Sequence, residues 1–207
     1  MSVVLAESHY LPCLEYYVLM IGADHFILEY AENYQKQSYR NRSRILTAQG
    51  PLELYIPVLK PGGKVVMKDV EIDYGQKWVK DHWRSISTAY GNAPFFEHFA
   101  SYFHDVYHSR PRFLVDLNLH FITLCNKLLN LQTTLSKTDQ FKDSHPQVDV
   151  DSRNLIHPKR RLKTTTFYQP CNYNQIFGKK FVANLSIIDL LFCEGPEAVE
   201  ILIKSKA

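Results

Sequence analysis

The first apolar and polar segments of the chain predict a βαβ unit. Residues 3–6 are apolar and partly β-branched, which is typical of a buried strand. After Pro12, residues 13–21 form an aromatic and leucine-rich run, which predicts a helix that stops near Gly22. Residues 25–30 predict a second strand. Because such a crossover normally joins parallel strands, this pattern indicates an α/β fold.

The remaining pattern predicts further strands and a helical middle section. A hairpin is expected from strands at 51–59 and 65–74, joined by the Pro-Gly-Gly turn at 61–63. Several segments have the apolar periodicity of helices: residues 78–89, 95–107, 113–135, 187–192 and 197–203. A short strand is expected at 164–169. We therefore predict a mixed, partly parallel sheet flanked by helices, in one domain over residues 1–207.

Composition narrows the class of protein. The net charge of +3 is too small to favour nucleic-acid binding. No apolar run approaches the length of a membrane-spanning helix, and no secretory signal pattern opens the chain. The four cysteines are scattered without CxxC spacing, so free thiols and a cytoplasmic location are expected. Residues 136–151 are polar and predict a mobile loop.

The segment from residue 34 to residue 45 carries the main candidate chemistry. In an extended chain Arg40, Arg42 and Arg44 would point to one side, with Lys36 nearby. Guanidinium groups in such a row can bind a carboxylate or phosphate through paired hydrogen bonds. Asn41 would face the opposite side. The alternative is a solvated edge strand, whose positive charge discourages pairing with another strand.

His9 lies in the predicted turn after the first strand. Open α/β sheets usually bind ligands at the carboxyl ends of their strands, and a helix N-terminus there favours anions. His9 is therefore a candidate site residue, although a turn histidine can equally bond only to the backbone.

Three other patterns have ordinary alternatives. Asp69, Glu71 and Asp73 alternate along one predicted strand and could bind a cation, but more often form the solvated face of a sheet. His104 and His108 are one helical turn apart, with no third ligand indicated. The basic cluster at 157–163 is most simply a solvated charge run. No metal site is predicted, and the sequence does not identify a cofactor.

Four segments, in this order, resemble the WbqC-like family of bacterial proteins. The matching residues are the Tyr-Leu-Pro turn at 10–12 with its aromatic helix and Asp24, the Asn41-Arg42 pair with Ile45, the group His82, Tyr90 and Pro94, and the run from Asn184 to Gly195-Pro196. The family's first motif often begins His-Gln-Pro, where this chain has Ala6, Glu7 and Ser8, and a common glycine is replaced by Glu15. His9 is the nearest substitute for the missing histidine.

The family is associated with surface-polysaccharide (O-antigen) gene clusters, so the resemblance implies an enzyme acting on a nucleotide-activated sugar, through acyl or aminoacyl transfer to a sugar amine. Arg40 and Arg42 would then hold the diphosphate, and His9 or His82 would be the general base. The expected site has these residues: His9, Tyr10, Lys36, Arg40, Asn41 and Arg42, with His82 and Tyr90 behind. The alternative is a non-catalytic protein that binds the same small anionic ligand. RNA binding by the Arg, Lys and Tyr residues ranks third.

Overall fold

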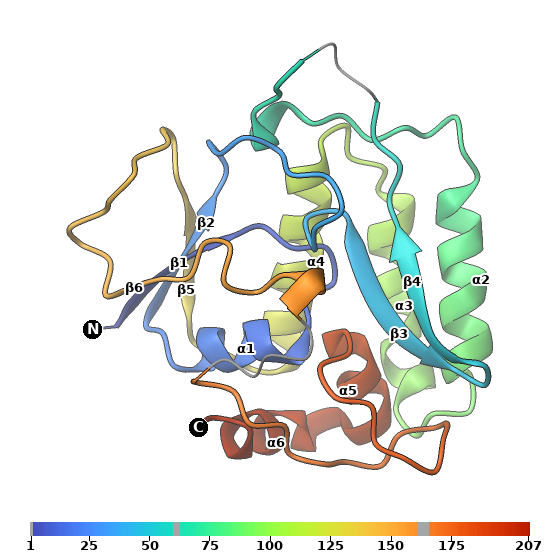
Figure 1. Ribbon diagram of the computed structural model, residues 1–207. Helices are drawn as coiled ribbons and strands as arrows, with labels where there is room; N and C mark the ends of the chain where they lie inside the picture. Colours follow the sequence, from blue (N-terminus) through green and yellow to red (C-terminus); the bar gives the residue numbers. More distant parts are fainter. Residues whose placement is uncertain (1, 60–62, 161–165) are drawn as a thin grey trace.

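A four-stranded parallel sheet forms one part of the molecule (Figure 1). The computed structural model describes residues 2–59, 63–160 and 166–207. The sheet has the order β5-β2-β1-β6, and all three pairings are parallel. Its strands are β1 (Val3–Glu7), β2 (His25–Glu29), β5 (Thr134–Lys137) and β6 (Val150–Asp151). The predicted α/β class with a partly parallel sheet is confirmed.

The path of the chain through this sheet creates a switch point beside β1. From β1 the chain passes through α1 (Leu14–Ile21) to β2, and later to β5 on the far side of β2. It then returns across the sheet and places β6 on the other side of β1. Ligand sites of open parallel sheets lie where the strand order reverses in this way, outside the carboxyl ends of the strands.

A separate antiparallel ribbon contains the arginine segment. It pairs β3 (Arg42–Thr47) with β4 (Gly50–Tyr55), and Gly50 adopts a positive φ of 106° in the turn. The hairpin predicted between 51–59 and 65–74 is present only in part, as one antiparallel bridge between Val58 and Ile72 with a backbone hydrogen bond on each side of it. The rest of 65–74 forms a 3-10 helix, Met67–Asp69, and isolated bridges to other segments. Of the turn predicted at 61–63, residues 61 and 62 lie outside the described part of the chain.

Helices cover the ribbon and complete the core (Figure 1). They are α2 (Trp78–Tyr90), α3 (Phe96–His108), α4 (Leu114–Leu128), α5 (Ile187–Glu194) and α6 (Ala198–Lys204). Phe103, Phe121 and Phe192 are fully buried where α3, α4 and α5 meet. Among the described helices, none has the length and apolar character needed to cross a membrane.

Three predicted boundaries differ from the structure. The helix expected over 113–135 ends at Leu128, and β5 begins six residues later, at Thr134. The polar segment 136–151 contains the end of β5 and all of β6. In the predicted strand 164–169, the first two residues lie outside the described part, and the rest contains one bridge, from Tyr168 to Lys206.

Candidate active site

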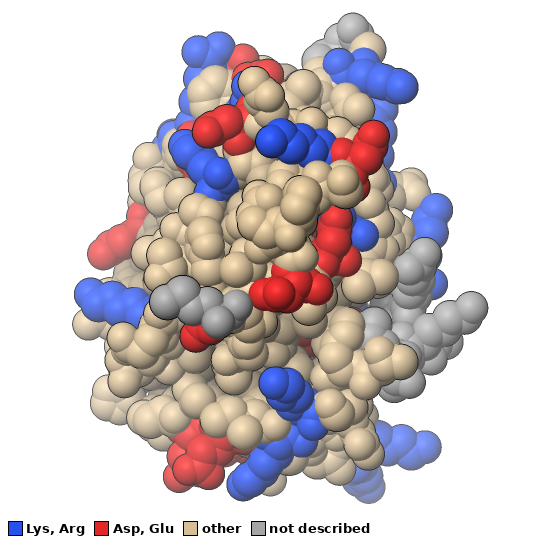
Figure 2. All heavy atoms as spheres, turned by 90° about the vertical axis from the view of Figure 1, so that its left-hand side faces the viewer, with Lys and Arg blue, Asp and Glu red and all other residues tan. Residues whose placement is uncertain are grey.

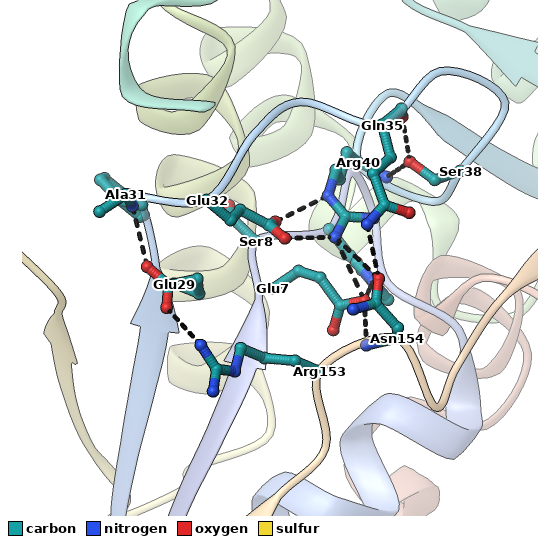
Figure 3. Close-up of polar contacts among 12 residues, drawn as sticks. Glu7, Ser8, Glu29, Ala31, Glu32, Gln35, Ser38, Arg40, Arg153 and Asn154 are labelled. Carbon is teal, nitrogen blue, oxygen red and sulfur yellow. Dashed lines mark hydrogen bonds and ion pairs between the residues drawn. The ribbon is translucent and has the colours of Figure 1, made fainter. Parts of the chain in front are cut away.

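Charged side chains converge at the carboxyl ends of the parallel strands (Figure 3). Glu7 ends β1 and Glu29 ends β2, and the two are register partners in the sheet. Arg153 and Asn154 follow the end of β6 after one intervening residue, so they reach the same edge from the other side of β1. The group therefore lies at the switch point between β1 and β6, which we call the β1–β6 crevice.

Arg40 is the buried cation of the β1–β6 crevice. Its side chain is 1% exposed, and its Nε and Nη2 donate to both carboxylate oxygens of Glu32 at 2.7 and 2.6 Å. Nη2 also lies 3.5 Å from Glu7 Oε1 and 3.4 Å from Asn154 Oδ1. Arg40 belongs to a turn before β3, where Ser38 accepts its backbone N–H. The expected row of three arginines is therefore wrong, because Arg40 points inward from a turn and is already paired.

Glu7 is the most perturbed carboxyl group in the crevice. Burial raises its pKa from 4.5 to about 7, although Arg40 and the backbone N–H of Asn154, which donates to Oε1 at 2.8 Å, oppose that rise. The guanidinium of Arg40 forms a bidentate ion pair with Glu32. Its longer contact with Glu7 therefore offsets only part of the free-energy cost of burying the Glu7 carboxylate. A carboxyl that titrates near neutral pH can both accept and donate a proton there.

His9 is adjacent to Glu7 and has unused polar atoms. It is fully buried, its ring contacts those of Tyr16 and Tyr39, and its Nε2 lies 4.0 Å from Glu7 Oε1. Neither ring nitrogen has a hydrogen-bond partner among the described residues. Burial lowers the pKa of His9 well below its usual value, and the neighbouring charges of Arg40 and His157 lower it further. A neutral imidazole offers one donor and one acceptor to a ligand.

Arg153 forms two further ion pairs in the crevice. Arg153 donates to Glu29 at 3.1 Å and to Asp151 at 2.6 Å, and Glu29 is itself fully buried. Above these groups is an opening of about 380 Å³, lined by Glu32, Phe141, Asp143, Asp151, Arg153 and Asn154. Figure 2 shows acidic and basic side chains interspersed on this side of the molecule, without a large area of one sign. The lining is more acidic than basic, which suits amine and hydroxyl groups better than a bare anion.

Tyr10 and His82 meet away from the crevice. The hydroxyl of Tyr10 bonds to His82 Nδ1 at 2.9 Å and also to the hydroxyl of Tyr107. His82 Nε2 accepts the backbone N–H of Tyr55 at 3.1 Å. Burial lowers the pKa of His82 to about 4. Both ring nitrogens are thus occupied by internal partners, so His82 joins β4 and α2 to the turn that follows β1.

The other predicted site residues are also dispersed. Lys36 is exposed, and Asn41 donates to the carbonyl of Ile56 at 2.8 Å. Arg42 is part-exposed on the ribbon, 3.4 Å from Glu53 and over the ring of Tyr55. Tyr90 donates to Asp189 at 2.7 Å and accepts the N–H of Leu46 at 3.1 Å. Of the eight predicted residues, the structure brings His9 and Arg40 together at the crevice. Lys36 is four residues before Arg40 in the sequence and is exposed.

Sequence reasoning missed five crevice residues: Glu7, Glu29, Glu32, Arg153 and Asn154. Glu7 had a usable signal, because it is the carboxylate that directly follows the predicted first strand. The carboxylates Asp69, Glu71 and Asp73 do not share a strand face, and Glu71 pairs with Arg112 at 2.8 Å. Among the described residues, no group of three or more His, Cys, Asp or Glu side chains is placed to hold a metal ion.

A comparison with models of protein families identifies the family of this chain. The model of the WbqC-like protein family matches residues 7–172 and 153–201. The chain is also similar to the Mycobacterium tuberculosis protein named "Uncharacterized protein Rv1507c", with 28% identity over 97% of each chain. No solved structure matches significantly. The family match begins at Glu7 and includes every crevice residue described above.

Proposed function

The chain belongs to the WbqC-like protein family, and from that premise we propose an enzyme that transfers an acyl or aminoacyl group to the amine of a nucleotide-activated sugar. The observation that carries the proposal is the position of Glu7, a buried carboxyl with a pKa of about 7 at the switch point of a parallel sheet. Its neighbour His9 supplies unpaired polar atoms, and the nearby acidic opening suits an amino sugar; Glu32 and Asn154 line that opening, whereas Glu7 and His9 are buried beneath its lining.

In the proposed reaction, Glu7 is the general base. The sugar amine attacks the carbonyl carbon of an activated acyl donor, such as a thioester, and a C–N bond forms. The bond from the carbonyl carbon to sulfur breaks, and the thiolate leaves with the electron pair. Glu7 accepts the proton that the amine loses and can return it to the thiolate. A pKa near the working pH favours both transfers.

His9 and Arg40 have different proposed roles. The imidazole of His9 stays neutral and would hold a substrate hydroxyl or the reacting carbonyl oxygen through its unpaired nitrogens. Arg40 is a positioning residue, because its guanidinium holds Glu32 and Glu7 in place rather than facing the opening.

The diphosphate is better assigned to exposed cations at the edge of the crevice than to Arg40. Lys36 follows Gln35, whose side-chain amide donates to Asn154 Oδ1 at 2.8 Å. Lys159 is exposed and lies two residues after His157, whose charge lowers the pKa of His9. Both lysines therefore extend from segments that contact the crevice, and each could approach a phosphate as a mobile point charge.

Two observations favour a second candidate, a binding protein without catalysis. Arg40 and Arg153 are both paired with carboxylates inside the fold, as in a purely structural ion network. The histidine that often begins the family's first motif is also absent here, where the chain has Ala6.

Activity and binding assays separate the two candidates. The protein is incubated with nucleotide-linked amino sugars and a panel of acyl thioesters and aminoacyl donors, and products are detected as a mass gain on the sugar. We expect Glu7→Gln to bind the nucleotide sugar in calorimetry but to form no product, whereas the exposed-site control Glu200→Gln keeps both properties. Binding without product in the unmodified protein supports the binding protein. Absence of binding at millimolar ligand contradicts both candidates.

A further inference from the structure

A second concave site lies between α2, α3 and the turn before α2. Its volume is about 900 Å³, within the usual range for small-molecule sites. The residues that carry the inference are Tyr74, Lys77, Lys80, Trp83, Arg84 and Arg110. We call it the α2–α3 groove. In Figure 1, α2 and β6 lie on opposite sides of the molecule, so the groove is separate from the β1–β6 crevice.

The groove is lined by cations from several segments. Lys80 and Arg84 are one turn apart on α2, Lys77 immediately precedes that helix, and Arg110 follows α3. Among the described residues that line the groove, none is Asp or Glu. Arg84 does contact the exposed Asp81 at 3.2 Å, but exposed pairs of this kind contribute little and can be displaced by a more highly charged anion.

The start of α2 adds a second feature that favours anions. Lys77 is the N-cap residue, and it makes no capping hydrogen bond through its side chain. The first N–H groups of a helix have no acceptor within the helix, and the helix dipole places partial positive charge there. Gly75, Gln76 and Lys77 bring this helix start to the edge of the groove, although the Gly75 N–H and the Gln76 side chain already donate to Asp73, each at 2.9 Å.

Aromatic rings supply the apolar part of the groove. Trp83 is half-buried between α2 and α3, with its ring 5.2 Å from that of His104. Tyr74 lies under the guanidinium of Arg110, whose Cζ is 4.9 Å from the ring centroid. Aromatic side chains flanked by cations match a ligand that combines a planar ring with negative charge.

We propose that the α2–α3 groove binds a nucleoside phosphate, with the base against Trp83 or Tyr74 and the phosphates against Lys77, Lys80 and the start of α2. A phosphate alone would leave the aromatic rings unused, and a neutral aromatic ligand would leave the lysines unused. The small net charge of the chain argues against extended nucleic acid. The proposal does not rest on the function assigned to the crevice.

Trp83 provides a direct signal for the test. The chain has only 2 tryptophans, and the other, Trp78, is buried. Nucleoside diphosphates with each common base are titrated while tryptophan emission is recorded, and Trp83→Phe identifies the source of the signal. We expect saturable quenching that weakens roughly tenfold in Lys77→Gln/Lys80→Gln, the equivalent of two exposed charge contacts. The matched control Lys127→Gln/Lys204→Gln changes two exposed lysines elsewhere and should leave the affinity unchanged.

Titrations with further ligands identify which part of a ligand the α2–α3 groove recognises, and some outcomes would overturn the proposal. Equal affinity for nucleotide sugars and free diphosphates supports recognition of the nucleotide half, while preference for the free form supports a nucleotide sensor. Pyrophosphate binding as tightly as the nucleotides, a single-stranded RNA binding more than about tenfold tighter than mononucleotides, or no quenching at millimolar ligand would each overturn it. Glu7→Gln should leave the quenching unchanged, so failure here is distinct from failure of the crevice proposal.

Discussion

Replacing Glu7 with glutamine tests the electrostatics of the β1–β6 crevice independently of any substrate. Glutamine has nearly the shape of a protonated glutamate, and its oxygen can still accept the backbone N–H of Asn154. The substitution therefore removes the titration of this position with little change in packing. Because Glu7 is 2% exposed, its ionisation is coupled strongly to folding.

The size and sign of the effect follow from the pKa of Glu7, which rises from 4.5 to about 7 on folding. Between these values the folded protein keeps a proton that the unfolded chain has released, so stability falls as pH rises. A shift of about 2.5 units corresponds to about 3 kcal/mol, and about 2.5 kcal/mol of the change occurs between pH 5 and 8. Relative to the unmodified protein, Glu7→Gln should gain that amount of stability across this range.

Urea denaturation at several pH values between 5 and 8 measures this difference. Other buried groups titrate in the same range, including His9, whose lowered pKa makes stability fall as pH drops below about 6.5. Groups far from Glu7 contribute equally in both proteins, so their contributions cancel in the difference, whereas His9, 4.0 Å from Glu7, is coupled to the substitution. Glu200→Gln, at an exposed position on α6, should follow the unmodified protein at every pH. A pH-independent difference for Glu7→Gln would show that Glu7 is ionised as readily in the fold as in the unfolded chain, and the proposed general base would lose its basis.

Three further substitutions test other parts of the structure by urea denaturation. Arg40→Met leaves buried carboxylates without their cation and should lower the free energy of unfolding by about 3–5 kcal/mol. Adding Glu32→Gln should recover part of that loss. A double variant that is no more stable than Arg40→Met alone would contradict the pairing of Arg40 with Glu32. Folding lowers the pKa of His82 from 6.5 to about 4, so acidification from pH 6.5 to 4 should cost the unmodified protein about 3 kcal/mol of stability through this residue. His82→Gln should not show that loss on acidification. Gly195→Ala should lower the free energy of unfolding by about 2–4 kcal/mol, because residue 195 has a φ of 54° and a Cβ there would overlap the ring of Phe95. An unchanged stability would mean that the turn after α5 can rearrange.

The βαβ unit was predictable because each of its elements carries its own local signal. The apolar strand β1, the proline before α1 and the apolar strand β2 agree with one another, and the structure confirms all three. β6 had no such signal. It is 2 residues long, lies at the end of a polar segment, and is a strand only because Val150 pairs with Val4 far away in the sequence.

The arginine segment shows the limit of periodicity. The alternation holds from residue 42 onward, where Ser43 and Ile45 are buried and Arg42 and Arg44 are part-exposed. Arg40 is two residues before Arg42 but belongs to a turn, so it points toward Glu32 instead of following the row. Only the positions of the opposite charges reveal this, and those charges come from other segments of the chain.

The bond from the backbone of Asn154 to Glu7 spans 147 residues, and this separation has a consequence for biosynthesis. A chain emerges from the ribosome with its N-terminus first. Until 154 of the 207 residues have been made, β1 lacks its neighbour β6, and the carboxylates around Arg40 lack their last partner. A nascent or truncated chain that stops before residue 150 should therefore expose an unpaired strand edge, and such fragments should bind chaperones or aggregate even though the βαβ unit is complete.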